Sequence, residues 1–168
     1  MSDFLKRTWA EIDLDAIRHN FGVIEASLAP GSRAMAVVKA DAYGHGAGYV
    51  SRALQEAGAS WFGVSNLDEA MQIRNAGIVE PILILAYTPP EEAARLAAFS
   101  VSQAVLTREY AVRLSEEAVR AGVRVRVHVK IDTGMSRVGL FYQEAGRDDG
   151  IIDEVEAIVR LPGLEPEG

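Results

Sequence analysis

The chain has 168 residues, of which 49% are hydrophobic and 24% charged, and its formal net charge at pH 7 is −7. This length predicts one domain with a sizeable core. The acidic balance argues against a nucleic-acid surface, and the lack of cysteine excludes disulfides and thiolate metal sites. No apolar run approaches the roughly 20 residues of a membrane span, and residues 1–7 lack a signal-peptide core. We therefore expect a cytoplasmic protein without nucleic-acid or membrane partners.

The hydrophobic pattern predicts strands that alternate with helices. Residues 8–13 alternate like a short strand, and Asp13 or Asp15 can cap the helix that follows through residues 17–24. Further strands are expected at residues 34–39, 61–65, 81–87, 102–106 and 123–131, with helices at about 49–57, 67–76, 90–98, 108–121 and 148–160. Such alternation indicates βα units joined in a parallel sheet.

Lys39 ends the apolar run over residues 34–38 and precedes a glycine-punctuated turn. Burial disfavours an ammonium group, so a lysine at the end of a buried strand is expected to act as a nucleophilic amine. The usual partner of such an amine is a carbonyl, and pyridoxal phosphate is the common example. A snorkelling lysine is the alternative. Tyr43 offers a hydroxyl to a phosphate oxygen, and His45 either adds a polar contact or bonds to backbone.

A second polar segment alternates strictly over residues 123–131, where Arg124, Arg126, His128 and Lys130 share one face. An edge strand with a solvated face is one interpretation of the two arginines. The residues after Lys130, Asp132-Thr133-Gly134, form a bend that can return Arg137 toward the strand.

Acidic pairs stand in or near the first turns of predicted helices, at Asp68/Glu69, Glu91/Glu92 and Glu116/Glu117. Carboxylates there favour the helix dipole, and we expect these pairs to face solvent. His19 and His128 have no companions at metal-ligand spacing, so we expect no metal site.

The twelve residues 36–47, AVVKADAYGHGA, resemble the alanine racemase family of fold-type III pyridoxal phosphate enzymes. The resemblance continues through residues 63–78 and 88–91 and is most specific at residues 130–139, KIDTGMSRVG. It implies that Lys39 carries pyridoxal 5'-phosphate covalently and acts as one catalytic base, while Tyr43 holds the phosphate.

The same resemblance implies that Lys130 is carbamylated. Its anionic product would hold Arg137 against the cofactor ring and the substrate. Only a neutral amine adds carbon dioxide, and burial beside other cations favours neutrality. The product can then pair with the planar guanidinium of Arg137.

For the fold, the resemblance implies an α/β (β/α)8 barrel, of which this chain supplies about five barrel strands and the start of a sixth at residues 164–168. We expect residues 1–168 to be the N-terminal part of the barrel domain, with the remaining barrel strands and a C-terminal β-domain absent. A complete five-stranded flavodoxin-like domain is the structural alternative.

The implied activity is pyridoxal-phosphate-dependent racemisation of L-alanine to D-alanine for peptidoglycan. In the family the enzyme is a homodimer whose active site is shared between subunits, because the second base is a tyrosine of the partner. We expect this chain alone to bind cofactor weakly or not at all and to be inactive. The alternatives are a racemase or decarboxylase of another amino acid on the same barrel, and a non-catalytic cofactor carrier or inert fragment.

Overall fold

The fold is built on one sheet of six parallel strands, and the computed structural model describes residues 8–168. The strands are β1 (Met35–Val37), β2 (Trp61–Val64), β3 (Ile82–Ile84), β4 (Val101–Val105), β5 (Val125–Val129) and β8 (Leu164–Pro166). Each of these six strands pairs with the one named before it, so their order in the sheet follows their order in the chain. A flavodoxin-like sheet would place its second strand outside the first, so this order excludes that alternative.

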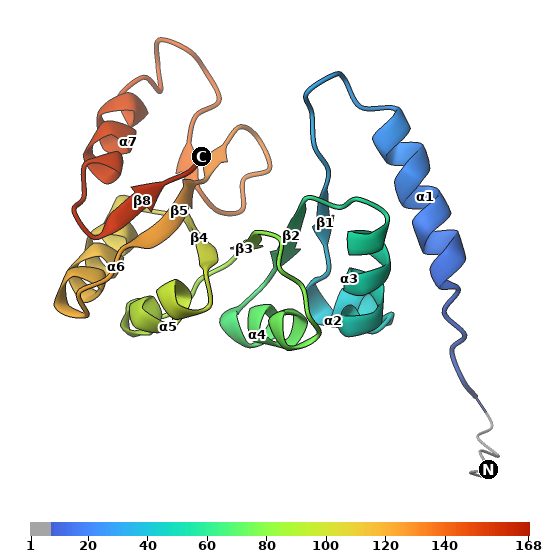
Figure 1. Cartoon of the computed structure of the whole chain (residues 1–168). Helices are drawn as coiled ribbons and strands as arrows, with labels where there is room; N and C mark the ends of the chain where they lie inside the picture. The colour runs from blue at the N-terminus through green and yellow to red at the C-terminus, as the bar shows by residue number, and fades with distance from the viewer. Residues whose placement is uncertain (1–7) are drawn as a thin grey trace.

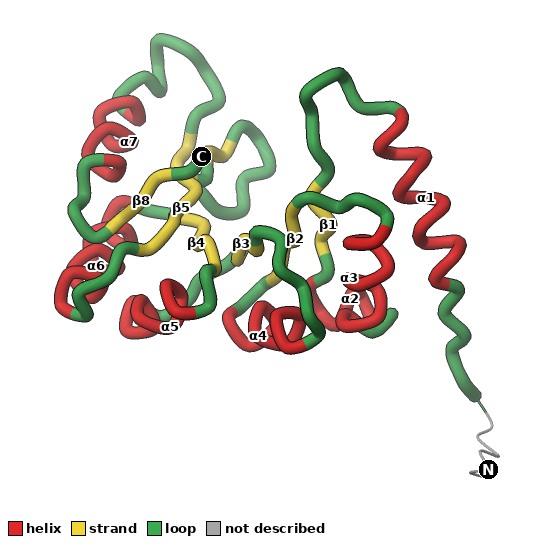
Figure 2. The backbone as a smooth tube through the Cα atoms, viewed as in Figure 1, coloured by secondary structure: helices red, strands yellow, loops and turns green. Residues whose placement is uncertain are grey.

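Helices cover one side of the sheet, which forms an open arc in Figure 1. They are α1 (Leu14–Ala26), α3 (Ala47–Glu56), α4 (Leu67–Asn75), α5 (Ala93–Ala98), α6 (Arg108–Arg120) and α7 (Ile151–Val159), with a 3-10 turn at Pro90–Glu92. A short element, α2 (Lys39–Gly44), follows β1, and a two-stranded ladder joins β6 (Ile131–Asp132) to β7 (Leu140–Phe141). Figure 2 shows that the chain between β5 and α7 is mostly loop. Within residues 8–168 no pairing joins β1 to β8, so the arc stays open.

Side-chain caps start several of these helices. Asp13 accepts hydrogen bonds from the backbone N–H groups of Asp15 and Ala16, at 2.9 and 3.0 Å, at the start of α1. Asn66 and Thr107 cap α4 and α6 in the same way. The first N–H groups of a helix have no partner within the helix, so these oxygens satisfy donors that would otherwise lack one.

The main core lies between the sheet and the helices. It includes fully buried side chains from both layers, among them Phe62, Ile82, Ile84, Ile73, Leu96 and Leu114. The opposite, concave face is less covered at β1, where Met35 and Val37 are 37% and 39% exposed. At Gly63 on the same face an added Cβ would lie 3.2–3.4 Å from two side chains of β1 and from Leu85, which follows β3, so glycine permits this packing.

Most predicted elements are confirmed to within a few residues, and two expectations about strands are wrong. Residues 8–13 have no regular structure, and Trp9 is 74% exposed. A strand exists only beside a partner, and within the described residues none pairs with this segment. The edge-strand interpretation of β5 also fails, because β4 and β8 flank it. Residues 1–7, where we expected no signal-peptide core, lie outside the described range.

Across residues 8–168, every helix is too short or too polar to cross a membrane.

Arg74, at the end of α4, ties two connecting loops together. Its guanidinium donates to the carbonyl oxygens of Ile78, Glu80, Phe99 and Ser100 at 2.8, 2.7, 3.2 and 3.0 Å. One side chain thus joins the segment before β3 to the segment before β4.

We expect Arg74→Ala to lower the free energy of unfolding by about 2 kcal/mol, because charged hydrogen bonds to several carbonyl groups are lost. Equilibrium urea unfolding measures the change. Arg120→Ala is the matched control, since the one side-chain contact of Arg120 within residues 8–168 is an exposed ion pair with Glu117. Its loss should change stability by less than about 0.5 kcal/mol. Equal losses in the two variants would contradict this assignment.

Candidate functional site

The predicted site residues follow the carboxyl-terminal ends of strands β1 and β5. Lys39 and Tyr43 belong to α2 after β1, Lys130 directly follows β5, and Arg137 lies in the loop between β6 and β7. The carboxyl-terminal edge of a parallel sheet is where α/β folds hold their ligands. The topology therefore places all four residues at the edge where a site is expected.

The turn that carries Lys39 is left-handed. Ala40, Asp41, Ala42 and Tyr43 have φ angles of 51°, 53°, 53° and 56°. Left-handed backbone costs about 1–2 kcal/mol for each residue that has a Cβ. The sequence predicts a glycine-punctuated turn here, but the left-handed residues precede Gly44 and none of them is glycine. The surrounding structure must therefore hold this conformation.

Backbone hydrogen bonds and Asp41 support the turn from two sides. The Ala42 N–H donates to the Val38 carbonyl at 2.9 Å, which ties the turn to the end of β1. The Asp41 carboxylate accepts from the Ala47 N–H at 2.7 Å and thereby satisfies a donor at the start of α3. The Asp41 carbonyl also accepts from the Gly46 N–H at 2.9 Å.

Glu69 of α4 provides the third support. Its Oε1 accepts from the Ala40 N–H at 2.9 Å, and its Oε2 accepts from the Ser65 N–H at 2.7 Å. We expected Glu69 to face solvent, and that expectation is wrong: the side chain is half-buried and bridges the ends of β1 and β2. The spacing Asn66-x-x-Glu69 is a capping-box signal that could have indicated an inward role.

The Lys39 amine is open to a ligand. The residue is half-buried, not buried as expected, and its Nζ lies 5.9 Å from the centroid of the Tyr43 ring. Within residues 8–168 this Nζ makes no hydrogen bond or ion pair. Tyr43 is 61% exposed, so its hydroxyl is accessible. His45 bonds through Nδ1 to the Ala42 carbonyl at 2.8 Å, which is the backbone alternative.

Lys130 is fixed through its backbone between β4 and β7. Its N–H donates to the Val105 carbonyl at 2.9 Å, and its carbonyl accepts from the Leu140 N–H at 2.8 Å. Its Nζ donates to the Ile131 carbonyl at 2.9 Å. Gly139, at φ +114°, passes so close that an added Cβ would lie 2.7 Å from Lys130 Cγ. A side chain at position 139 would displace the lysine.

Asp132 shapes the loop that carries Arg137. Its Oδ1 accepts from the N–H groups of Gly134 and Ser136 at 3.1 and 3.0 Å. These hydrogen bonds, first that of Ser136, stabilise the carboxylate and lower the pKa of Asp132. Arg137 itself is exposed at the tip of the loop.

Lys130 and Arg137 border one cavity of about 560 Å³. Side chains in or next to β3, β4, β5 and β6, together with the loop that carries Arg137, complete its lining, namely Leu83, Leu85, Ala104, His128, Val129, Asp132, Thr133, Met135 and Val138. The structure thus brings together the second pair of predicted site residues. Lys39 and Tyr43 do not line this cavity, so the two pairs of predicted site residues do not share it.

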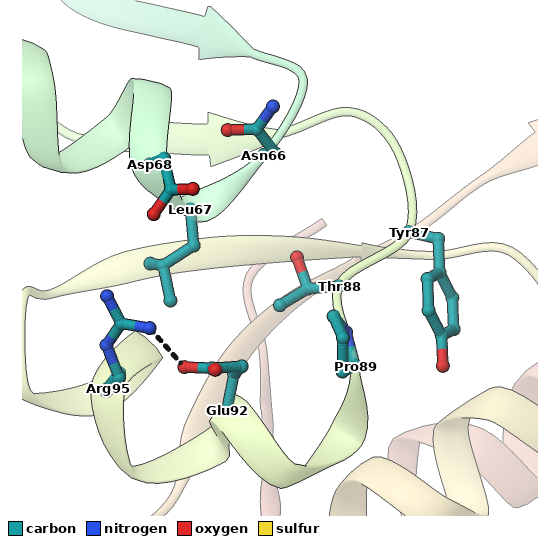
Figure 3. A pocket seen from close by; sticks show the side chains of 8 residues that line it. All are labelled: Asn66, Leu67, Asp68, Tyr87, Thr88, Pro89, Glu92 and Arg95. Carbon is teal, nitrogen blue, oxygen red and sulfur yellow. Dashed lines mark hydrogen bonds and ion pairs between the residues drawn. The ribbon is translucent and has the colours of Figure 1, made fainter.

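A separate hollow of about 230 Å³ lies between the start of α4 and the loop after β3. Figure 3 shows its lining, in which Glu92 accepts a hydrogen bond from Arg95 at 2.7 Å. Asp68 borders this hollow and makes no hydrogen bond or ion pair with any described residue. Because no predicted site residue reaches it, this hollow is distinct from the Lys39 turn.

Comparison with known proteins matches residues 12–168 to the family model described as alanine racemase, N-terminal domain. The alanine racemase of Desulfosudis oleivorans is 43% identical over 171 residues, covering 100% of this chain and 43% of that protein. A solved alanine racemase of Clostridium difficile aligns with a TM-score of 0.86 and 34% identity, covering 99% of this chain and 42% of that one. A histidine racemase of Leuconostoc mesenteroides aligns with a TM-score of 0.75 and 32% identity, over 90% of this chain and 39% of its own.

The chain therefore spans less than half the length of these relatives. The sequential order of its six parallel strands and its likeness to the solved racemases confirm the expected partial (β/α)8 barrel. The match over nearly all of the chain and the agreement in fold lead to one conclusion. This chain belongs to the alanine racemase N-terminal domain family.

Proposed function

We propose that this chain supplies the cofactor-bearing lysine of a pyridoxal-phosphate-dependent racemase that converts L-alanine to D-alanine. The observation that carries the proposal is the free amine of Lys39, presented at the carboxyl edge of β1 by a strained turn. In this proposal residues 1–168 are the N-terminal part of the barrel domain. On the family resemblance, the rest of the barrel, a C-terminal β-domain and the second catalytic base would not be among these residues.

The residues of the turn fit pyridoxal 5'-phosphate. Lys39 Nζ has no carboxylate partner among the described residues, and the nearby Tyr43 hydroxyl is accessible to a phosphate oxygen. When bound, the cofactor supplies an aldehyde for covalent attachment and a ring that withdraws electrons from the substrate α-carbon. Lys39 would hold the cofactor, and Tyr43 would orient its phosphate.

Racemisation requires a proton to leave one face of the α-carbon and another to arrive on the opposite face. The Lys39 amine can move the proton on its own face. Tyr110 is a poor candidate for the second face, because burial raises its pKa and it packs against Tyr87 with ring centroids 5.3 Å apart. We infer that the second base is a tyrosine of a partner subunit, in a cytoplasmic homodimer with a shared site. The family resemblance supports this inference.

Lys130 would act after carbamylation. Carbon dioxide adds to the neutral amine with loss of a proton, and the resulting anion can pair with Arg137 across the shared cavity. Asp132 lines the same cavity, but its Oδ1 already accepts from two backbone amides. A modified Lys130 therefore gives Arg137 a more available anionic partner. Held in this way, Arg137 would lie against the cofactor ring and the substrate.

A racemase for another amino acid is the second candidate, because the similar histidine racemase has the same fold. Alanine is favoured by relatives that are 42–43% identical over nearly the whole chain and are named alanine racemase, and by the higher TM-score of a solved alanine racemase, 0.86 against 0.75.

We expect excess pyridoxal phosphate followed by borohydride to label Lys39 ahead of the chain's other lysines, Lys6 and Lys130. The free amine on a fixed turn is the reason, and mass spectrometry of tryptic peptides measures the labelling. Lys39→Ala should lose the adduct, and Lys130→Ala should keep it. Equal labelling of all three lysines would contradict the role of Lys39. Release of D-alanine by the pure chain would contradict the need for a second base from elsewhere.

Carbamylation of Lys130 can be observed directly. In solutions of ¹³C-labelled bicarbonate we expect a carbamate carbon resonance from the wild-type chain, which Lys130→Ala removes and Lys39→Ala retains. Carbon-13 NMR makes the measurement. A resonance of equal intensity in the wild type and in Lys130→Ala would assign the carbamate to another amine, and no resonance from the wild type would leave Lys130 unmodified in this chain.

Acidification should loosen the Arg137 loop. The folded pKa of Asp132 lies below its ordinary value of 3.8. The stabilisation it provides is therefore complete above that value and is lost as the pH falls through the lowered pKa. We expect the amide resonances of Gly134 and Ser136 to shift together, with a midpoint below pH 3.8, in a two-dimensional NMR titration. Asp132→Asn should abolish the shift, and its persistence there would assign the titration to another group.

A further inference from the structure

We propose that Glu69 is a positioning residue whose carboxylate holds the backbone at Ala40 and thereby fixes Lys39. The inference rests on the proposed function of Lys39 as the cofactor-bearing amine. Glu69 acts on Lys39 through the peptide group that follows it, and it would not touch the cofactor or the substrate.

The carboxylate lies where the ladder between β1 and β2 ends. The last backbone bond of that ladder joins the Val38 N–H to the Gly63 carbonyl at 2.8 Å. Beyond it the chain after β1 turns left-handed, so the next amides cannot continue the strand pairing. The Glu69 carboxylate instead accepts from one amide beyond each strand, the Ala40 N–H after β1 at 2.9 Å and the Ser65 N–H after β2 at 2.7 Å. The side chain thus replaces the missing backbone link between the two strand ends.

Helix α4 holds this carboxylate in place. The Glu69 N–H donates to the Asn66 side chain at 2.9 Å, so the residue sits in the first turn of the helix. A negative charge is favoured at that end of a helix, and bonds from an amide to a carboxylate are stronger than neutral ones. Capping alone would require only contacts within this segment. The bond to Ala40, 29 positions earlier in the chain, serves the Lys39 turn.

Loss of the Glu69 hydrogen bond should slow the reaction of Lys39 with the cofactor. Ala40 is the first of the four left-handed residues, and its amide is the anchor closest to the Lys39 Cα. Losing that anchor lets the strained turn relax, which moves the amine. Because displacements near 1 Å can slow a positioned reaction by about 100-fold, even partial relaxation should slow attachment of the cofactor by at least about tenfold.

The test compares Glu69→Ala, Glu69→Gln and the control Asp68→Asn in the 168-residue chain. Asp68 is adjacent, exposed and without a described hydrogen bond or ion pair. One measurement is amide hydrogen exchange by NMR. We expect exchange at Ala40 and Ser65 to accelerate at least about tenfold in Glu69→Ala, since both amides lose their acceptor. Glu69→Gln keeps one acceptor oxygen and should retain protection at one of the two. Asp68→Asn should leave both unchanged.

The second measurement is the rate at which pyridoxal phosphate becomes borohydride-trapped on Lys39. We expect it to fall about tenfold or more in Glu69→Ala, to fall less in Glu69→Gln, and to stay unchanged in Asp68→Asn. Labelling of Lys130 should not change in any variant, which separates local positioning from general unfolding. Glu69→Gln, nearly isosteric, remains informative if Glu69→Ala does not fold.

The outcomes distinguish the two proposals. Faster exchange at Ala40 with an unchanged Lys39 rate would overturn the positioning role and leave Glu69 a purely structural residue. Unchanged exchange at Ala40 in both Glu69 variants would also overturn it. If Lys39 of the wild type fails to react even with excess pyridoxal phosphate, the labelling of Lys39 expected under the proposed function is wrong, and exchange at Ala40 still decides whether Glu69 holds the turn.

Discussion

The left-handed turn after β1 is the constraint on which the site depends. Four successive residues with a Cβ, Ala40 to Tyr43, each cost about 1–2 kcal/mol in this conformation. The sum is comparable with the whole net stability of a typical domain, about 5–15 kcal/mol. Such a turn persists only if the structure around it over-determines it. Here β1, α3 and α4 each contribute, through the Val38 carbonyl, the Ala47 N–H bonded to Asp41, and the Glu69 carboxylate.

That arrangement places strained backbone next to the amine proposed to bear the cofactor. A right-handed turn at the same place would lead the chain and the lysine side chain in a different direction. The left-handed turn instead opens the backbone at Ala40 to a side chain from α4, and it leaves Lys39 Nζ near the Tyr43 ring with no charged partner among the described residues. Strained backbone clusters at functional sites because the surrounding fold can sustain it.

Sequence reasoning found the elements but missed this turn. Hydrophobic periodicity located the strands and helices, because each period reflects which face is buried. It placed Lys39 and Lys130 at strand ends for the same reason. Ala40, Ala42 and Tyr43 carry no local signal for positive φ, and the bond from Glu69 to Ala40 spans 29 positions, so neither was predictable from spacing. The strand expected at residues 8–13 failed because alternation indicates a strand only where a neighbouring strand exists to pair with it.

The polar side chains along β5 have different contacts at the two ends of the strand. Arg124 donates to the Leu164 carbonyl at 2.5 Å, and Arg126 lies 3.7 Å from the Glu167 carboxylate, so both attach β8 to the sheet. Farther along, Lys130 follows the strand and borders the cavity that it shares with Arg137. In a (β/α)8 barrel the amino-terminal ends of the strands serve stability and the carboxyl-terminal ends carry the chemistry. The polar alternation that suggested a solvated edge therefore has two uses along the strand. Its first residues bind the segment of β8, and its end places the Lys130 amine at the cavity.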